Sequence, residues 1–149
     1  VHGNIIENNR GYGGIAGGRP GSNLISENII KNNGDVKVDE YGNVYDFRFG
    51  ISVAGSSNII VGSTITNHSK GIWMSFSDNI IYHNNFISNT NQVSIKEGET
   101  NTWDDGCPSG GNYWSDYTLR YPDAQELEIQ AYGTHHTTLM HTIKTGILS

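Results

Sequence analysis

The feature that most constrains the fold of this chain is an internal repeat with a period of 21 residues. Residues 50–67 read Gly-Ile, then Ser-Asn-Ile-Ile, then Thr-Ile-Thr-Asn, and residues 71–88 read Gly-Ile, then Asp-Asn-Ile-Ile, then Asn-Phe-Ile-Ser. Weaker copies lie at 14–33, at 3–9 and from residue 91 onward. Each copy holds three short β-rich runs separated by polar turns, and such a unit cannot bury its apolar side chains alone. The copies must therefore stack on one another.

This repeat predicts an all-β fold, a right-handed parallel β-helix (a solenoid) of about four coils with about 21 residues each. Stacking at about 4.8 Å per coil pairs each strand with its counterparts above and below. The isoleucines then form inward ladders and the asparagines form ladders at the bends, since asparagine tolerates the left-handed conformation and bonds to neighbouring backbone. A low-complexity, aggregation-prone tract and a strand–helix repeat are weaker alternatives. The isoleucine register is kept along the chain, and no segment has the apolar period of an amphipathic helix.

The coils are predicted to span residues 1–100, with one interruption at 35–49. Asn23 and Asn58, which occupy the same position of the repeat, are 35 residues apart instead of 21. The extra residues are interpreted as an inserted loop or hairpin. Insertions in repeat arrays go to one surface, often the binding surface. An inserted loop without a binding role explains this one equally well. Because the array starts in mid-coil, additional β-helix coils are expected N-terminal to this segment.

An aromatic and glycine-rich C-terminal cap is predicted over residues 101–128. Within it, residues 102–117 contain four aromatic, three aspartate and three glycine residues. Large rings can cover the last apolar layer of a solenoid, and glycine lets the chain fold across the open end.

Two stretches of this cap resemble the terminal motif of the NosD-like, CASH-domain (carbohydrate-binding and sugar hydrolase) β-helix proteins. They are Asn-Thr-Trp-Asp-Asp-Gly at 101–106 and Gly-Gly-Asn-Tyr-Trp-Ser-Asp-Tyr at 110–117. Together with the coils, the resemblance covers residues 1–128. It implies a right-handed parallel β-helix, export to the periplasm, cell surface or extracellular space, and a role in surface architecture or sugar recognition. The NosD branch is named for a periplasmic protein tied to copper delivery in nitrous-oxide reductase maturation.

An irregular tail is predicted at 129–149, where the repeat is absent. Possible codons for residues 128–148 are compatible with a family-like continuation once a single base is restored. We hypothesise that a one-base deletion shifted the reading frame of this tail, and the DNA sequence decides the question. In that case the tail histidines do not form a metal site. Cys107 stands where the family is expected to have an aromatic residue, and as the single cysteine it permits no internal disulfide.

No catalytic residue is predicted. Glycoside hydrolysis uses two carboxylates about 5–10 Å apart, and between residues 50 and 94 the one acidic residue is Asp78. We therefore expect a non-catalytic extracellular or cell-surface module, structural or carbohydrate-binding, whose partner is a polysaccharide or another cell-envelope component. Two alternatives stay open: a fragment of a polysaccharide lyase or glycoside hydrolase with its active site in other coils, and a NosD-like periplasmic copper-maturation factor.

Three kinds of ligand have candidate residues. Exposed aromatic rings suit sugars, oxygen ligands suit calcium and soft ligands suit copper. The candidates are, for carbohydrate, Trp73, Phe76, Trp103, Tyr113 and Trp114; for calcium, Asp104, Asp105 and Asp116; and for copper, His68, His83 and Met74. Each set also has a structural explanation, as buried cap rings, as aspartates that cap turns and as incidental surface residues. No cofactor is required, and calcium and copper are the possible ions.

Charge and hydropathy exclude two classes of partner. The net charge of −6 and the lack of a lysine or arginine cluster argue against a nucleic acid. The sequence has no run of 18 apolar residues, so no membrane span is predicted.

Overall fold

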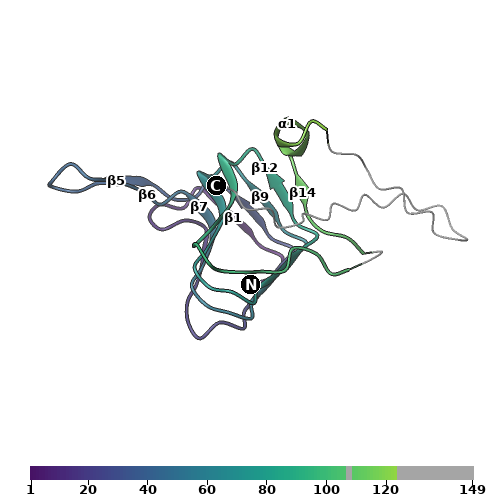
Figure 1. Ribbon diagram of the computed structural model, residues 1–149. Coiled ribbons are helices and arrows are strands. Elements are labelled where there is room, and N and C mark those ends of the chain that lie inside the picture. Colours follow the sequence, from purple (N-terminus) through teal and green to yellow (C-terminus); the bar gives the residue numbers. More distant parts are fainter. Residues whose placement is uncertain (107–108, 124–149) are drawn as a thin grey trace, which may run out of the picture.

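The computed structural model describes residues 1–106 and 109–123 and consists mostly of short β-strands (Figure 1). The elements are β1 (Ile5–Glu7), β2 (Ile15–Gly17), β3 (Leu24–Ser26), β4 (Ile29–Lys31), β5 (Val36–Val38), β6 (Val44–Asp46), β7 (Phe49–Val53), β8 (Ile59–Val61), β9 (Thr64–Thr66), β10 (Lys70–Met74), β11 (Ile80–Tyr82), β12 (Asn85–Ile87), β13 (Asn91–Ile95), β14 (Tyr113–Trp114) and α1 (Tyr117–Arg120). No helix among these residues is long and apolar enough to cross a membrane.

The strands form three parallel sheets that run along the stack of coils. Sheet A has the order β11-β8-β3, sheet B the order β1-β4-β9-β12-β14, and sheet C the order β13-β10-β7-β2. Each complete coil gives one strand to each sheet, as β8, β9 and β10 do in succession. The prediction of an all-β parallel β-helix is confirmed.

The isoleucines stack in register inside the coils, as predicted. Ile51 pairs with Ile72 in sheet C and Ile60 with Ile81 in sheet A, and all four side chains are buried. In the corresponding column of sheet B, Ile65 pairs with Phe86 and Phe86 with Trp114. Alternate residues of each strand face outward, so one inward residue per short strand is enough to build the apolar column. Burial of each such side chain stabilises the fold by about 1.5–3 kcal/mol.

Asparagine ladders line the three corners between the sheets. In the ladder before sheet A, Asn58 Nδ2 donates to Asn79 Oδ1 at 2.7 Å, and Asn79 Nδ2 donates to Asn101 Oδ1 at 2.8 Å. A buried amide needs such partners, because an unpaired one loses its hydrogen bonds to water. The three ladders are Asn23, Asn58, Asn79 and Asn101 before sheet A; Asn4, Asn28, Ser63, Asn84 and Asn112 between sheets A and B; and Asn9, Asn33, His68 and Asn89 between sheets B and C.

The left-handed residue of each corner is the one before the ladder residue. Ser57, Gly62 and Asn67 have φ angles of 59°, 62° and 58°, and each directly precedes a ladder residue. The expectation that the ladder asparagines themselves turn the chain is therefore wrong. Their side chains point inward and satisfy the corner backbone, as Asn58 Nδ2 does by donating to the Gly55 carbonyl at 2.8 Å.

Residues 35–49 include an antiparallel hairpin of β5 and β6, in which Val38 pairs with Val44. The hairpin projects from the coils at the corner between sheets B and C (Figure 1). At its base, the Phe47 amide donates to the Asp35 carbonyl at 2.9 Å. This excursion accounts for the 35-residue offset between Asn23 and Asn58.

After β13 the chain closes over the end of the stack. Strand β14 joins sheet B beside β12, and the Trp114 ring stacks on Phe86 with 4.5 Å between centroids. Trp103 packs against the same apolar cluster. The predicted cap boundary at 128, the tail at 129–149 and Cys107 lie outside the described residues.

Candidate functional site

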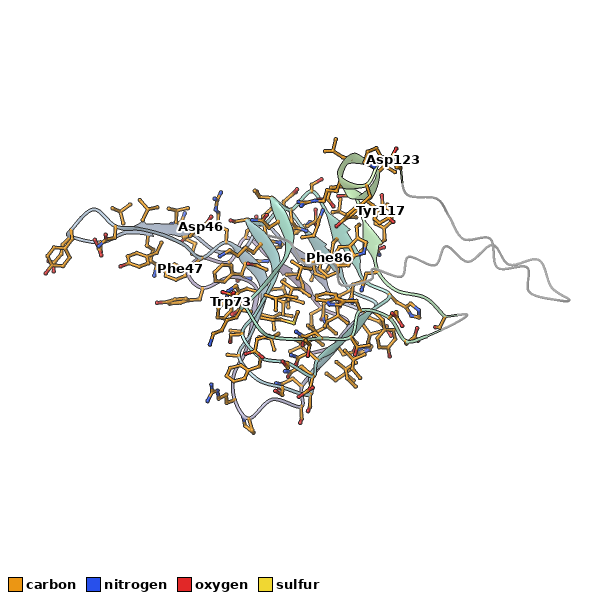
Figure 2. The ribbon with its side chains drawn as sticks, in the orientation of Figure 1. Asp46, Phe47, Trp73, Phe86, Tyr117 and Asp123 are labelled. Atoms are coloured by element: carbon orange, nitrogen blue, oxygen red, sulfur yellow. The ribbon has the colours of Figure 1, made fainter. Side chains whose placement is uncertain are left out.

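Five aromatic rings form a continuous series on the outside of the solenoid, here called the aromatic stripe. Its members are Tyr12, Tyr45, Phe47, Phe49 and Trp73. The ring centroids are 4.4 Å apart for Tyr12 and Phe47, 6.4 Å for Phe47 and Phe49, and 6.2 Å for Phe49 and Trp73. Tyr45 stacks on Phe47 at 6.1 Å. Figure 2 shows Phe47 beside the hairpin and Trp73 on the body of the coils.

Strand alternation places these rings. In β6 and the residues that follow, Tyr45, Phe47 and Phe49 occupy alternate positions, while Val44 and Asp46 point to the other face of the hairpin. Trp73 takes the outward position in the middle of β10, where its neighbours in the adjacent coils are Ser52 and Ser94.

The Trp73 ring is partly exposed. Tyr12 is 65% exposed and Tyr45 is 45% exposed. The stripe is therefore a solvent-facing surface and not an extension of the core.

Two lysines lie over the rings of the stripe. Lys37 Nζ is 5.2 Å from the centroid of Tyr12 and 5.9 Å from that of Phe47. Lys70 Nζ is 5.1 Å from the centroid of Phe49. Ammonium groups within about 6 Å of a ring face are attracted by its quadrupole.

The carboxylate of Asp46 is already paired. Arg48 donates to it through Nε at 2.9 Å and through Nη2 at 2.8 Å. These hydrogen bonds from Arg48 hold the pKa of Asp46 well below its usual range. Asp46 is therefore an ionised partner of Arg48, and it has no proton to give as a general acid near neutral pH.

The other predicted carbohydrate residues are placed apart from the stripe. Phe76 lies under the Arg19 guanidinium, 4.1 Å from the ring centroid. Trp103 and Trp114 are partly buried against the core. Tyr113, by contrast, is 58% exposed. Carbohydrate binding at these four residues remains a prediction.

A pocket of about 470 Å³ lies between β12, β14 and α1. Its lining includes Tyr113, Trp114, Asn85 and His83. Its volume is in the range of about 300–1,000 Å³ that small-ligand sites occupy. His83 Nε2 donates to the Ser109 carbonyl at 2.9 Å and is 3.5 Å from Asp105 Oδ1, so the rim of the pocket is polar.

The structure does not bring the three predicted calcium ligands together. Asp104 Oδ1 accepts from the Gly106 amide at 2.9 Å, which is a turn contact. Asp105 accepts from Ser109, while Asp116 pairs with Arg120 and accepts from Gln92. Asn112, which lies near them in the sequence, is a ladder residue.

The predicted copper ligands are also separated. His68 belongs to the ladder between sheets B and C, and Met74 is fully buried in the core. His83 lies at the corner between sheets A and B. Burial lowers the pKa of His68 to about 4, so this imidazole is neutral at pH 7.

Most members of the stripe were missed at the sequence level. Tyr45, Phe47 and Phe49 alternate with other residues, and this period of two is a signal that their rings share one face. No sequence pattern predicts that Tyr12 or Lys70 lies near these rings, because they contact them only once the coils have stacked.

The chain is a parallel β-helix domain. Its three parallel sheets stack in register around an apolar column that the asparagine ladders border, and the aromatic stripe lies on the outside. The chain belongs to the NosD family: the family model described as periplasmic copper-binding protein (NosD) matches residues 1–119. The resemblance inferred from the coils and the cap is thereby confirmed. No curated protein and no solved structure gives a significant match to the chain.

The donors in the described part of the chain do not fit a copper site. Within residues 1–106 and 109–123, no three side chains of His, Cys, Asp or Glu are grouped so that they could hold a metal ion. Of the soft donors, Met74 is fully buried, and the accessible His83 is engaged with Ser109. No chemistry is therefore assigned to copper in this domain.

Proposed function

We propose that this chain is a non-catalytic module of an exported protein that binds a polysaccharide along the aromatic stripe. The observation that carries the proposal is the unbroken series of five partly exposed rings outside the coils. The exposed parts of a row of rings offer apolar surface to successive sugar units, and rigid aromatic side chains lose little conformational entropy on binding. The family is described as periplasmic, which supports export.

The carboxylates do not favour catalysis at this surface. Hydrolysis of a glycosidic bond uses a protonated acid and a second carboxylate. Asp46 is next to Tyr45 in the chain but is ionised and held by Arg48. The stripe therefore supports recognition without bond cleavage.

Replacing Trp73 by alanine is expected to weaken polysaccharide binding by about tenfold or more, since loss of a well-placed aromatic anchor costs at least about 1–2 kcal/mol. Isothermal titration with oligosaccharides selected on a glycan array measures the effect. Tyr121→Ala is the matched control, because this exposed ring packs on Tyr117 and not on the stripe. Equal affinities for Trp73→Ala and the parent protein, or no binding by the parent protein to any glycan, contradict the proposal.

The family description favours a second candidate function, the handling of copper. Titration of the purified protein with Cu(I) and with Cu(II) tests it. Because the described donors are dispersed, we expect His83→Ala to take up as much copper as the parent protein. Stoichiometric binding that this substitution abolishes would instead support the copper function.

A further inference from the structure

The two lysines that lie over the aromatic stripe have no acidic partner in the described part of the chain. Lys31, Arg48 and Arg120 are each paired with a carboxylate. The ammonium groups of Lys37 and Lys70, in contrast, form no ion pair or hydrogen bond within the described residues, and they contact the rings of Tyr12, Phe47 and Phe49. In a protein of net charge −6, the stripe thus carries local positive charge.

We infer that the stripe selects an acidic polysaccharide, one with carboxylate groups along the chain such as a uronic-acid polymer. This inference rests on the proposed function, since it requires that sugars stack on the rings. The ammonium groups of Lys37 and Lys70 lie over the rings of Tyr12, Phe47 and Phe49, so the carboxylates of a sugar chain that contacts the stripe come within their reach. The lysines are compact charges on flexible stems, so they can follow carboxylates that repeat along a polymer.

Three acids of the hairpin, Asp35, Asp39 and Asp46, form no ion pair with Lys37 or Lys70, and Asp35 Oδ2 accepts from the Gly11 amide at 3.3 Å. Asp46 is neutralised by Arg48 on the opposite face of the hairpin. Asp39, at the hairpin tip, accepts from Asn43 and from the Tyr45 hydroxyl, and these hydrogen bonds keep its pKa low. The Tyr45 end is therefore negative, and the acidic polymer is directed to the segment from Tyr12 through Phe49 to Trp73.

The test compares two ligands that differ only in charge, an oligogalacturonate and the same oligomer with its carboxyl groups methyl-esterified. The parent protein is expected to bind the acidic oligomer about fivefold more tightly at low salt, a preference that two exposed ion pairs can supply. High salt is expected to remove the preference, because solvent-exposed charges are screened.

The double variant Lys37→Gln, Lys70→Gln is expected to bind both oligomers with the affinity that the parent shows for the ester. Lys96→Gln is the matched control, since Lys96 is also exposed and forms no ion pair in the described part of the chain but lies outside the stripe. Circular dichroism verifies that each variant is folded.

The outcomes separate the inference from the proposed function. If the parent protein binds both oligomers equally, or if the double variant keeps the preference, selection by charge is overturned while glycan binding stands. If neither oligomer binds and no neutral glycan binds either, the proposed function fails together with the inference. If Lys96→Gln loses the preference as fully as the double variant, the effect is general charge and the stripe is not its source.

Discussion

Replacing Asn79 by alanine is expected to lower the free energy of unfolding by about 4 kcal/mol, because it leaves several buried polar groups without partners at about 1–3 kcal/mol each. The Asn79 side chain is fully buried. Its Oδ1 accepts from the amide and from Nδ2 of Asn58 at 3.0 and 2.7 Å. Its Nδ2 donates to Asn101 Oδ1 at 2.8 Å and to the Phe76 carbonyl at 3.0 Å. Urea unfolding followed by far-ultraviolet circular dichroism measures the change.

Asn23→Ala is the control in the same ladder. Asn23 is exposed at the end of the column, and Asn58 Oδ1 is the acceptor for both its amide and its Nδ2. Its truncation removes one side-chain hydrogen bond and is expected to cost about 1 kcal/mol. Similar losses for the two variants would show that the ladder does not contribute through buried hydrogen bonds.

The coils were predictable because the fold repeats one local requirement. Ile51 and Ile72, or Asn58 and Asn79, stand 21 residues apart because one turn of the solenoid returns the chain to the same position. Each residue in such a column contacts the equivalent residues of the coils above and below. The same residue type therefore suits every coil, and the repeat is visible in the sequence.

The residues that turn the chain at the corners were not predictable from the sequence. Asparagine was expected to turn the chain, but the turn is made by the preceding residue, for instance Ser57 before Asn58. Both roles suit small polar residues, so composition alone does not separate the residue that turns from the residue that points inward.

The ring contacts of the aromatic stripe do not follow the 21-residue repeat, so the repeat does not predict them. Tyr12 precedes the first strand of sheet C, Phe47 follows the hairpin, and Trp73 lies in a later coil. Their rings meet at the base of the hairpin, where Phe47 contacts both Tyr12 and Phe49, and Phe49 contacts Trp73. An insertion breaks the repeat, and the position of its side chains is then set by packing that only the folded chain specifies.

The spacing of the repeat already indicates that His68 is a ladder residue. It lies 35 residues after Asn33 and 21 before Asn89, the same offsets that separate the members of the ladder before sheet A. At the sequence level it is a copper candidate or an incidental surface residue. In the structure it replaces a ladder asparagine and is 3% exposed.

The burial of His68 predicts a loss of stability in mild acid. Burial lowers its pKa from the ordinary 6.5 to about 4, so the unfolded chain binds a proton in this range and the folded chain does not. The free energy of unfolding is therefore expected to fall as the pH decreases from 6.5 to 4, by about 3 kcal/mol in all. Urea unfolding at a series of pH values measures this slope.

Burial is the main reason that the folded His68 does not take up a second proton, and the contact with Asn33 acts in the same direction, whereas the hydrogen bond to Asn89 favours the charged form. His68 Nδ1 lies 3.3 Å from Asn89 Oδ1 and its Nε2 lies 3.4 Å from Asn33 Nδ2. A neutral imidazole with the proton on Nδ1 satisfies both neighbours as donor and acceptor. A second proton on Nε2 would face the Asn33 amide hydrogens, and Asn33 cannot reverse its amide without breaking its bond to the Ile6 carbonyl.

His68→Asn is expected to remove this pH dependence and keep the fold, because asparagine is the residue that the same column uses at Asn33 and Asn89. Between pH 6.5 and 4 its free energy of unfolding should change by about 3 kcal/mol less than that of the parent protein. The carboxylates with lowered pKa, such as Asp46, titrate below this range and affect both proteins equally. Parallel slopes for the two proteins would show that the imidazole is protonated as easily in the folded ladder as in water, and the ladder would then not exclude the charge.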